Sequence, residues 1–473
     1  MSKAVSKVLH PIDQAVRKLY DRFPYPHYPL LAKLRWQEGY TSSSKFAARL
    51  LEQTTGCEAA INASRGQFVR NSRTVLVAGA GDTQPYIMRK NEPAAHRMMC
   101  VDLSAANLKR ARFRLKATMR STAFIHSEIN QFLKQQASVT GPYDHIDVYG
   151  VLHHLQNPSE TLKLLSSHLS SNGTMRIMVY NAPARNWIHQ FQLIFKLLKL
   201  DPFLKADRKI ARMILQRCAI ESPYLHNKMR SMKSIISNDS RLVDTFFHAR
   251  EAKISISRWF EILDNAGLKV FSLYDRYGEL DDIENPLWHP PTASELEQRS
   301  KKGSFCNNLE LYVCKKNIKP KSASSYGYEF KPKKVQLLPF YFKLPPIKWF
   351  RYPETRDIPW FSQIKIWHKF INEIYLRSNE TIDSYKNRFS TNTLKRLCRL
   401  GVIFPGQFKN ESLKQSMKEP LISETINIER NIDQVDFTLS PFMSEIDSLL
   451  KSRNLTDHRL RKLILLRLNK SQL

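Results

Sequence analysis

Short apolar runs alternate with stretches of helical periodicity between residues 70 and 185. Residues 74–78 lead directly into Gly79-Ala80-Gly81, and a second apolar run ends at Val101-Asp102. Runs of this length, bounded by glycine or by an acid, are typical of buried strands. Residues 104–116 carry apolar side chains at helical spacing, so we expect a helix after the second strand.

Three more strands are predicted in the same stretch. Residues 122–129 (TAFIHSEI) predict a short strand that ends near Glu128, and residues 143–155 (YDHIDVYGVLHHL) predict a strand running into a helix at Asn157-Pro158. Residues 174–181 predict a fifth strand, preceded by a turn at Asn172-Gly173. Strands that alternate with helices in this way indicate an α/β fold with a doubly wound parallel sheet.

The glycine turn after the first strand indicates a ligand that contains adenosine. Such a turn brings backbone N–H groups close to a nucleotide, and a carboxylate such as Asp102 can accept both ribose hydroxyls. A dinucleotide site would have a third glycine, but here Asp82 and Thr83 follow Gly81. Asp82 at the start of the helix would also repel a pyrophosphate. The later segments must therefore separate a dinucleotide from other adenosine cofactors.

Taken together, these segments resemble a class I S-adenosylmethionine-dependent methyltransferase. The resemblance lies in the glycine turn, the acid ending the second strand, FIHSEI, GVLHHL and the NG before the fifth strand. It resumes at residues 256–278, similar to the family's last helix and sixth strand, and at residues 307–316, similar to its seventh strand. It implies a Rossmann-like seven-stranded sheet whose last strand is antiparallel, with S-adenosyl-L-methionine as the cofactor.

The resemblance also implies which residues contact the cofactor. The glycine turn would lie under the methionine part, Asp102 would hold the ribose, Glu128 would accept from the adenine amino group, and Tyr149 would line the methyl side. The family commonly has an acid where this chain has Val77, so we take Asp82 as the partner of the methionine amino group. The full set of expected contacts is Ala78, Gly79, Ala80, Gly81, Asp82, Asp102, Leu103, Glu128, Ile129, Tyr149 and Gly150.

Methyl transfer from a sulfonium requires alignment and exclusion of water, and a base only if the acceptor must lose a proton. His153 and His154 are candidates because imidazole titrates near neutral pH, and Tyr149 is a third candidate. The histidines are equally consistent with residues that pack at the start of a helix. The sequence shows no forced pair of nucleophile and base.

Three regions outside the core bear on the acceptor. Residues 18–29 (KLYDRFPYPHYP) predict either a lid over the site or a clamp that holds the N-terminal helix, and resemble a YD-x-x-PYP-x-x-P stretch ahead of some bacterial methyltransferase domains. The insertion at residues 184–250 begins with an apolar helical pattern and is expected to form one wall of the site. Residues 275–291 predict an acidic loop. The expected acceptor contacts are Tyr20, Tyr25, Tyr28, Trp187 and Trp288.

Composition sets outer limits on the function. The formal net charge is +31 over 473 residues, which favours nonspecific attraction of polyanions such as RNA. The six cysteines form no CxxC pair, so neither a zinc site nor a disulfide framework is indicated. No apolar stretch is long enough to span a membrane, and we expect a cytoplasmic protein.

The sequence predicts four parts. They are residues 1–69 with the N-terminal helices and lid, a methyltransferase domain at 70–316, a linker at 317–335 and a mostly helical C-terminal domain at 336–473. We expect methyl transfer to a small molecule. The alternatives are a tRNA or rRNA methyltransferase and a non-catalytic scaffold that keeps the fold.

Overall fold

The computed structural model describes residues 10–28, 30, 42–44, 46–48, 51, 73–92, 96–115, 121–135, 141–221, 223–275, 278–279, 292–302, 305 and 308–318. Expectations for the C-terminal domain, for Trp288 and for most of the linker and the acidic loop lie outside these residues. None of the described helices is both long and apolar enough to cross a membrane.

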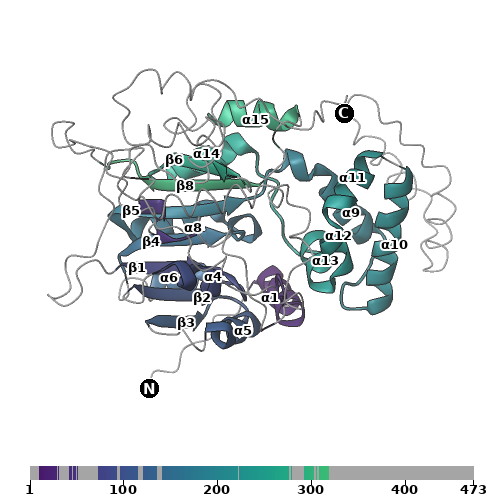
Figure 1. Ribbon diagram of the computed structural model, residues 1–473, viewed down its shortest axis with the longest axis horizontal. Helices are drawn as coiled ribbons and strands as arrows, with labels where there is room; N and C mark the ends of the chain where they lie inside the picture. The colour runs from purple at the N-terminus through teal and green to yellow at the C-terminus, as the bar shows by residue number, and fades with distance from the viewer. Residues whose placement is uncertain are drawn as a thin grey trace, which may run out of the picture.

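The described strands form one eight-stranded sheet in the order β3-β2-β1-β4-β5-β8-β6-β7 (Figure 1). Strands β1 to β5 pair in parallel, and β8 runs antiparallel between β5 and β6. The strands are β1 (Thr74–Ala78), β2 (Arg97–Asp102), β3 (Thr122–His126), β4 (Tyr143–Tyr149), β5 (Leu169–Val179), β6 (Leu268–Asp275), β7 (Gly278–Glu279) and β8 (Leu309–Lys315). The predicted fold class is therefore confirmed, with a two-residue strand β7 added at the edge.

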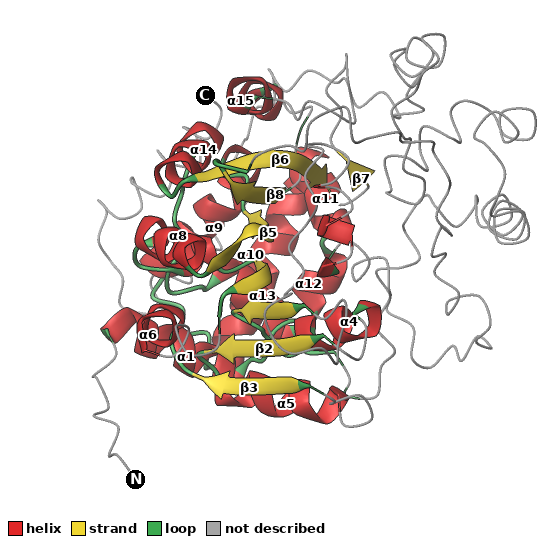
Figure 2. Ribbon diagram, turned by 90° about the vertical axis from the view of Figure 1, so that its left-hand side faces the viewer, coloured by secondary structure: helices red, strands yellow, loops and turns green. Residues whose placement is uncertain are grey.

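Two layers of helices cover the sheet. The helices are α1 (Pro11–Arg22), α4 (Gln84–Asn91), α5 (Ala105–Leu115), α6 (Ile129–Gln135), α8 (Pro158–Ser167), α14 (Ile256–Asn265) and α15 (Ala293–Lys301). Side chains of α6, α8 and α14 pack with Leu76 and Ile146 on one face, whereas α4 and α5 pack with Val75 and Val77 on the other (Figure 2). This alternation along β1 explains why its sequence is apolar throughout: both faces of a parallel sheet are covered.

The insertion forms a helical unit with a core of its own. It contains the short helix η2 (Pro183–Arg185) and helices α9 (Asn186–Leu197), α10 (Lys205–Glu221), α11 (Pro223–Ser231), α12 (Lys233–Ser237) and α13 (Asp239–Phe246). The apolar face of α9 is buried in this core, as its sequence predicts. Figure 1 shows the unit beyond the ends of the strands, with α1 between it and α5.

Two boundaries differ from the sequence predictions. The turn predicted at Asn172-Gly173 is wrong, because both residues lie within β5, at an irregularity in its pairing with β4. The strand predicted over residues 122–129 ends at His126, and Glu128 precedes helix α6. Asn157 begins helix α8 as predicted, and its side chain accepts a hydrogen bond from the Glu160 backbone N–H.

Candidate functional site

The glycine turn after β1 is tied to the end of β2. The backbone N–H groups of Gly79 and Ala80 both donate to the Val101 carbonyl at 2.9 Å. Gly79 has a φ of +70°, and a Cβ there would lie 2.2 Å from a Val151 methyl group. Only glycine fits at this position, because both the backbone conformation and the space exclude a side chain.

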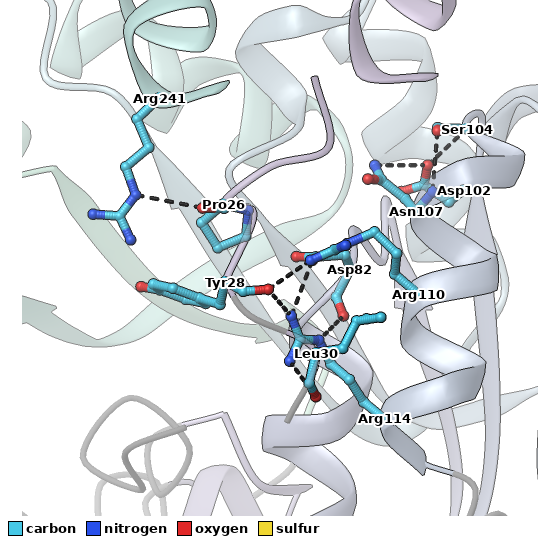
Figure 3. A network of polar contacts seen from close by, with 10 residues as sticks. All are labelled: Pro26, Tyr28, Leu30, Asp82, Asp102, Ser104, Asn107, Arg110, Arg114 and Arg241. Atoms are coloured by element: carbon cyan, nitrogen blue, oxygen red, sulfur yellow. Dashed lines mark hydrogen bonds and ion pairs between the residues drawn. The ribbon is translucent and has the colours of Figure 1, made fainter. Parts of the chain in front are cut away.

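Asp102 is buried and accepts hydrogen bonds from the backbone on both sides of the site. Its Oδ2 accepts from the Gly81 N–H at 2.7 Å. Its Oδ1 accepts from the Ser104 N–H at 2.8 Å (Figure 3). Burial raises the pKa of Asp102, against these two bonds, which favour its charged form. Oδ1 also accepts from Asn107 Nδ2 at 3.5 Å, whereas Oδ2 keeps a second lone pair that can accept a ligand hydroxyl. Ala78 is the last residue of β1, and Leu103 directly follows Asp102 at the end of β2.

Asp82 is fully buried between two arginines of α5 (Figure 3). Its Oδ2 lies 2.8 Å from Arg110 Nε and 3.3 Å from Arg114 Nη2. Its Oδ1 has no hydrogen-bond partner in the described part of the chain. A buried carboxylate oxygen without a donor is costly, and a cationic amino group would satisfy it. Asp82, which we expect to bind the methionine amino group, therefore has a hydrogen-bond acceptor that no described donor uses.

The N-terminal segment lies over the glycine turn. A Cβ on Gly81 would come 3.6 Å from the Tyr25 carbonyl oxygen. The Tyr28 carbonyl accepts from Arg110 Nη2 at 2.6 Å and from Arg114 Nη2 at 2.7 Å, so the arginines that hold Asp82 also hold this segment. The contact that would clamp the N-terminal segment to the core thus lies next to the glycine turn, where the predicted lid would also lie.

The same segment also contacts the insertion. Arg241 of α13 lies over the Tyr28 ring, 4.9 Å from its centroid, and its Nε is 3.4 Å from the Pro26 carbonyl (Figure 3). Tyr28 is buried against Ile87 of α4, whereas Tyr25 is 37% exposed. Tyr25 is therefore the tyrosine of this loop that remains most open to a ligand.

The remaining residues expected to bind the cofactor lie at the same edge of the sheet. Both carboxylate oxygens of Glu128 accept backbone N–H groups of α6, at 2.9 Å from Asn130 and 2.7 Å from Gln131. Ile129 is buried in the core beside it. Tyr149 is 36% exposed at the end of β4, where the Arg176 guanidinium lies 4.2 Å from its ring centroid.

Gly150 follows Tyr149 with a φ of +76° and donates its N–H to the Met178 carbonyl at 3.1 Å. The end of β4 is therefore fixed to β5 just where the chain leaves the sheet.

Both candidate histidines are buried in a stack of rings. His153 lies on Tyr180 with centroids 3.6 Å apart, and His154 lies on His248 at 3.7 Å. Neither ring nitrogen of His153 has a partner among the described residues, and His154 Nδ1 lies 2.7 Å from the Arg250 carbonyl. Burial lowers the pKa of His153 well below its usual value and that of His154 to about 4. Both rings are therefore neutral near pH 7.

A second polar cluster, which the sequence did not reveal, joins α1 to the insertion. The Tyr20 hydroxyl donates to Asp244 Oδ1 of α13 at 2.8 Å. Burial raises the pKa of Asp244 to about 7. Tyr180, which directly follows β5, has its pKa raised well above the usual value by burial, with the Asp244 charge adding to the effect. We call Tyr20, Tyr180 and Asp244 the phenol–carboxylate cluster.

Beside this cluster lies an ion pair between Arg185 and Glu251 in which both carboxylate oxygens accept hydrogen bonds. Arg185 donates to both oxygens of Glu251, at 2.8 and 2.9 Å, and its guanidinium lies 3.6 Å from the Tyr180 ring centroid. His189 Nε2 is 2.8 Å from Glu251 Oε1. Burial opposes ionisation of Glu251, but the hydrogen bond with His189 and the Arg185 charge outweigh it and hold its pKa well below the usual value.

Trp187 lies in the core of the insertion. Its ring contacts Phe191 and Phe246, and only 8% of the residue is exposed. Among the described residues, no three His, Cys, Asp or Glu side chains are placed to hold a metal ion.

Residues 76–175, which run from β1 into β5, match the profile of a family described as a methyltransferase domain. The chain contains a class I methyltransferase domain. The cofactor of this class is S-adenosylmethionine, so the family and the cofactor predicted from the sequence are confirmed.

The curated relatives of this chain include the uncharacterized protein syc1184_c of a Synechococcus strain. It is 26% identical over 279 residues, which cover 56% of this chain and 61% of that protein. The chain thus matches less than two thirds of the relative's length.

Solved structures with a similar fold include PKMT2 from Rickettsia typhi in complex with AdoHcy. It is 16% identical with a TM-score of 0.46, over 63% of this chain and 56% of that one. The plantazolicin methyltransferase BpumL in complex with SAH is 14% identical with a TM-score of 0.34, over 64% of this chain and 90% of that one.

Proposed function

We propose that this methyltransferase transfers the methyl group of S-adenosylmethionine to a small organic acceptor enclosed between the N-terminal segment and the insertion. The observation that carries the proposal is the Tyr25 carbonyl beside Gly81, 3.6 Å from where a Cβ would lie, which brings the N-terminal segment to the glycine turn. Enclosure excludes water and fixes the direction of attack, and these are the main requirements for methyl transfer from a sulfonium.

Four residues would hold the cofactor at this edge. Asp102 would accept from the ribose hydroxyls, with Oδ2 the oxygen that has one protein donor, and Asp82 Oδ1 would accept from the methionine amino group. Glu128 and Ile129 would flank the adenine. The cofactor supplies an activated methyl group, and the chain supplies its alignment.

Calorimetric titration of the full chain with S-adenosylmethionine tests the binding half of the proposal. Asp102→Ala is expected to weaken binding by about 1–3 kcal/mol, as for hydrogen bonds to a buried charge. Asp264→Ala is the matched control, since that carboxylate is exposed on α14 and, among the described residues, pairs with Lys316 alone. Equal affinity of both variants would contradict the assignment of Asp102.

The net charge of +31 supports a second candidate, methyl transfer to tRNA or rRNA. Transfer of labelled methyl groups into a fractionated lysate of cells that lack the protein separates the two. Label in low-mass material supports the small acceptor, and label in nuclease-sensitive material supports RNA. Failure to bind the cofactor would favour a scaffold without turnover.

A further inference from the structure

The phenol–carboxylate cluster lies where an acceptor would meet the methyl group. Tyr180 leaves the carboxyl end of β5, and the carboxyl ends of parallel strands are the ligand-binding edge of such sheets. Tyr25, whose carbonyl covers the glycine turn, is close enough to both Tyr20 and Tyr180 to raise their pKa values. The cluster therefore continues the cofactor site toward the insertion.

Asp244 is the acid of this region that lacks a cation. Asp244 is 3% exposed. Among the described side chains, the one hydrogen bond to its carboxylate comes from the Tyr20 hydroxyl and reaches Oδ1. Arg185, whose charge reaches Asp244, already donates to both oxygens of Glu251. His154 and His248 also face this region, but burial lowers both pKa values and leaves the rings neutral.

A buried carboxylate with one phenol donor and no cation is complementary to a cationic ligand. An ammonium group can donate to Oδ2, which accepts no hydrogen bond from the described side chains, in a charge-assisted bond. An acceptor without a charge would offer the ionised Asp244 no counter-charge.

We propose that Asp244, positioned by the Tyr20 hydroxyl, binds the acceptor as a protonated primary amine and takes one proton from it. This inference rests on the proposed methyl transfer and names the acceptor class. The ammonium N–H bond breaks and an O–H bond forms on Asp244. The freed nitrogen lone pair then forms the N–C bond to the methyl group, and the electron pair of the broken C–S bond stays on sulfur.

The environment of Asp244 suits this step better than that of the two histidines. A carboxyl with a pKa of about 7 can accept a proton near neutral pH and can release it afterwards. His153 is fully buried, and its ring is covered by Tyr180. Those histidines are therefore expected to support the Tyr180 ring rather than to exchange protons with the acceptor.

The test measures binding of n-butylammonium to the full-length protein in the presence of S-adenosylhomocysteine, with 1-butanol as the uncharged probe of the same shape. Saturation-transfer NMR is suited to the millimolar affinities expected for such small probes. The wild-type protein should bind n-butylammonium at least 10-fold more tightly than 1-butanol, and Asp244→Asn should abolish that preference. Tyr20→Phe should weaken n-butylammonium binding about 3-fold.

Asp239→Asn is the matched control, because it removes an acid from the same helix at a site where Arg208 and Arg212 already pair with it. It should keep the full preference. Asparagine can still accept from Tyr20, so Asp244→Asn should fold, and unchanged binding of S-adenosylhomocysteine confirms this.

Equal binding of the two probes by the wild-type protein, or a preference that survives Asp244→Asn, would overturn the inference. Failure of the wild-type protein to bind S-adenosylhomocysteine would overturn the proposed function itself. The two failures are therefore distinguishable in one experiment.

Discussion

Asp82 and Asp244 are both buried aspartates beside the same edge of the sheet, but their surroundings are opposite. Asp82 faces Arg110 and Arg114, and those arginines also hold the Tyr28 carbonyl. Asp244 faces a phenol and no described cation within salt-bridge distance. The first arrangement fixes a loop in place, whereas the second leaves a charge for a ligand to compensate. The contrast separates an acid that is paired with cations of the protein from an acid that has none within salt-bridge distance among the described residues.

Removing the Asp82 carboxylate, which pairs with Arg110 and Arg114, should lower the stability of the protein more than any other change considered below. Asp82→Ala leaves the charge of Arg114, whose side chain is 1% exposed, without its ion partner. We expect the free energy of unfolding to fall by about 3–5 kcal/mol, as when one partner of a buried ion pair is lost. Urea denaturation measures this. A loss below about 0.5 kcal/mol, as expected for the exposed control Asp264→Ala, would show that Asp82 does not anchor the segment.

Glu251 tests the same contrast by pH, since it is a second acid saturated by cationic and polar donors. Its folded pKa lies well below the unfolded value of about 4.3. Its stabilisation is therefore complete above pH of about 4.3 and is lost as the pH falls toward the folded pKa.

Glu251→Gln should cost about 2–4 kcal/mol at pH 7 because Arg185 loses its counter-charge. Thermal unfolding between pH 3 and 7 should show a gap between wild type and variant that narrows below pH of about 4.3. A gap that is constant over this range would contradict the ionised role of Glu251.

Asp244→Asn should have the opposite sign. Burial places the folded pKa at about 7, above the unfolded value of about 3.9, so the folded state holds the extra proton between these values. Wild-type stability due to this group therefore falls as the pH rises through that window.

The variant lacks this loss, and at pH 8 we expect it to be about 1–3 kcal/mol more stable than the wild-type protein. At pH 4 the two should agree closely. Thermal unfolding in paired buffers measures the difference, and a variant less stable at pH 8 would show that Asp244 is a structural acid like Asp82.

Gly81→Ala should give the smallest loss of stability, and it tests how tightly the N-terminal segment packs on the glycine turn. Gly81 has a φ of +59°, but the nearest atom to an added Cβ is the Tyr25 carbonyl at an ordinary 3.6 Å. The cost is then the backbone strain alone, about 1 kcal/mol. Gly79→Ala, with a contact of 2.2 Å to Val151, should cost clearly more in the same denaturation series. Equal losses would mean that strain, and not space, governs the turn.

The cofactor half of the site could be predicted from the sequence because its residues follow apolar strands directly. Asp102 ends β2 and the glycine turn follows β1, so local pattern alone places both at one edge. The Arg110 and Arg114 contacts had a weaker signal: the two residues are four apart on a predicted helix and share one face.

The contact between Tyr20 and Asp244, where we propose that the acceptor binds, could not be predicted in the same way. Tyr20 and Asp244 are 224 residues apart, and only the packing of α1 on α13 brings them together. Asp244 also lies in an amphipathic helix, where an acid is ordinary on the exposed face. The turn at Asn172-Gly173 failed for a related reason, since the pairing of β5 with β4 overrides the local turn preference of the pair.

The attachment of the N-terminal segment at two places has a consequence for rates. The Tyr28 carbonyl accepts a hydrogen bond from α5 and the Pro26 carbonyl accepts one from α13 (Figure 3). The segment beside the glycine turn is therefore held both to α5 and to the insertion. For a cofactor bound at the glycine turn as proposed, we expect exchange to require opening of these bonds, so the observed association rate should level off at high cofactor concentration. The plateau would be the opening rate of the segment, a property of the polypeptide that is independent of which acceptor is methylated.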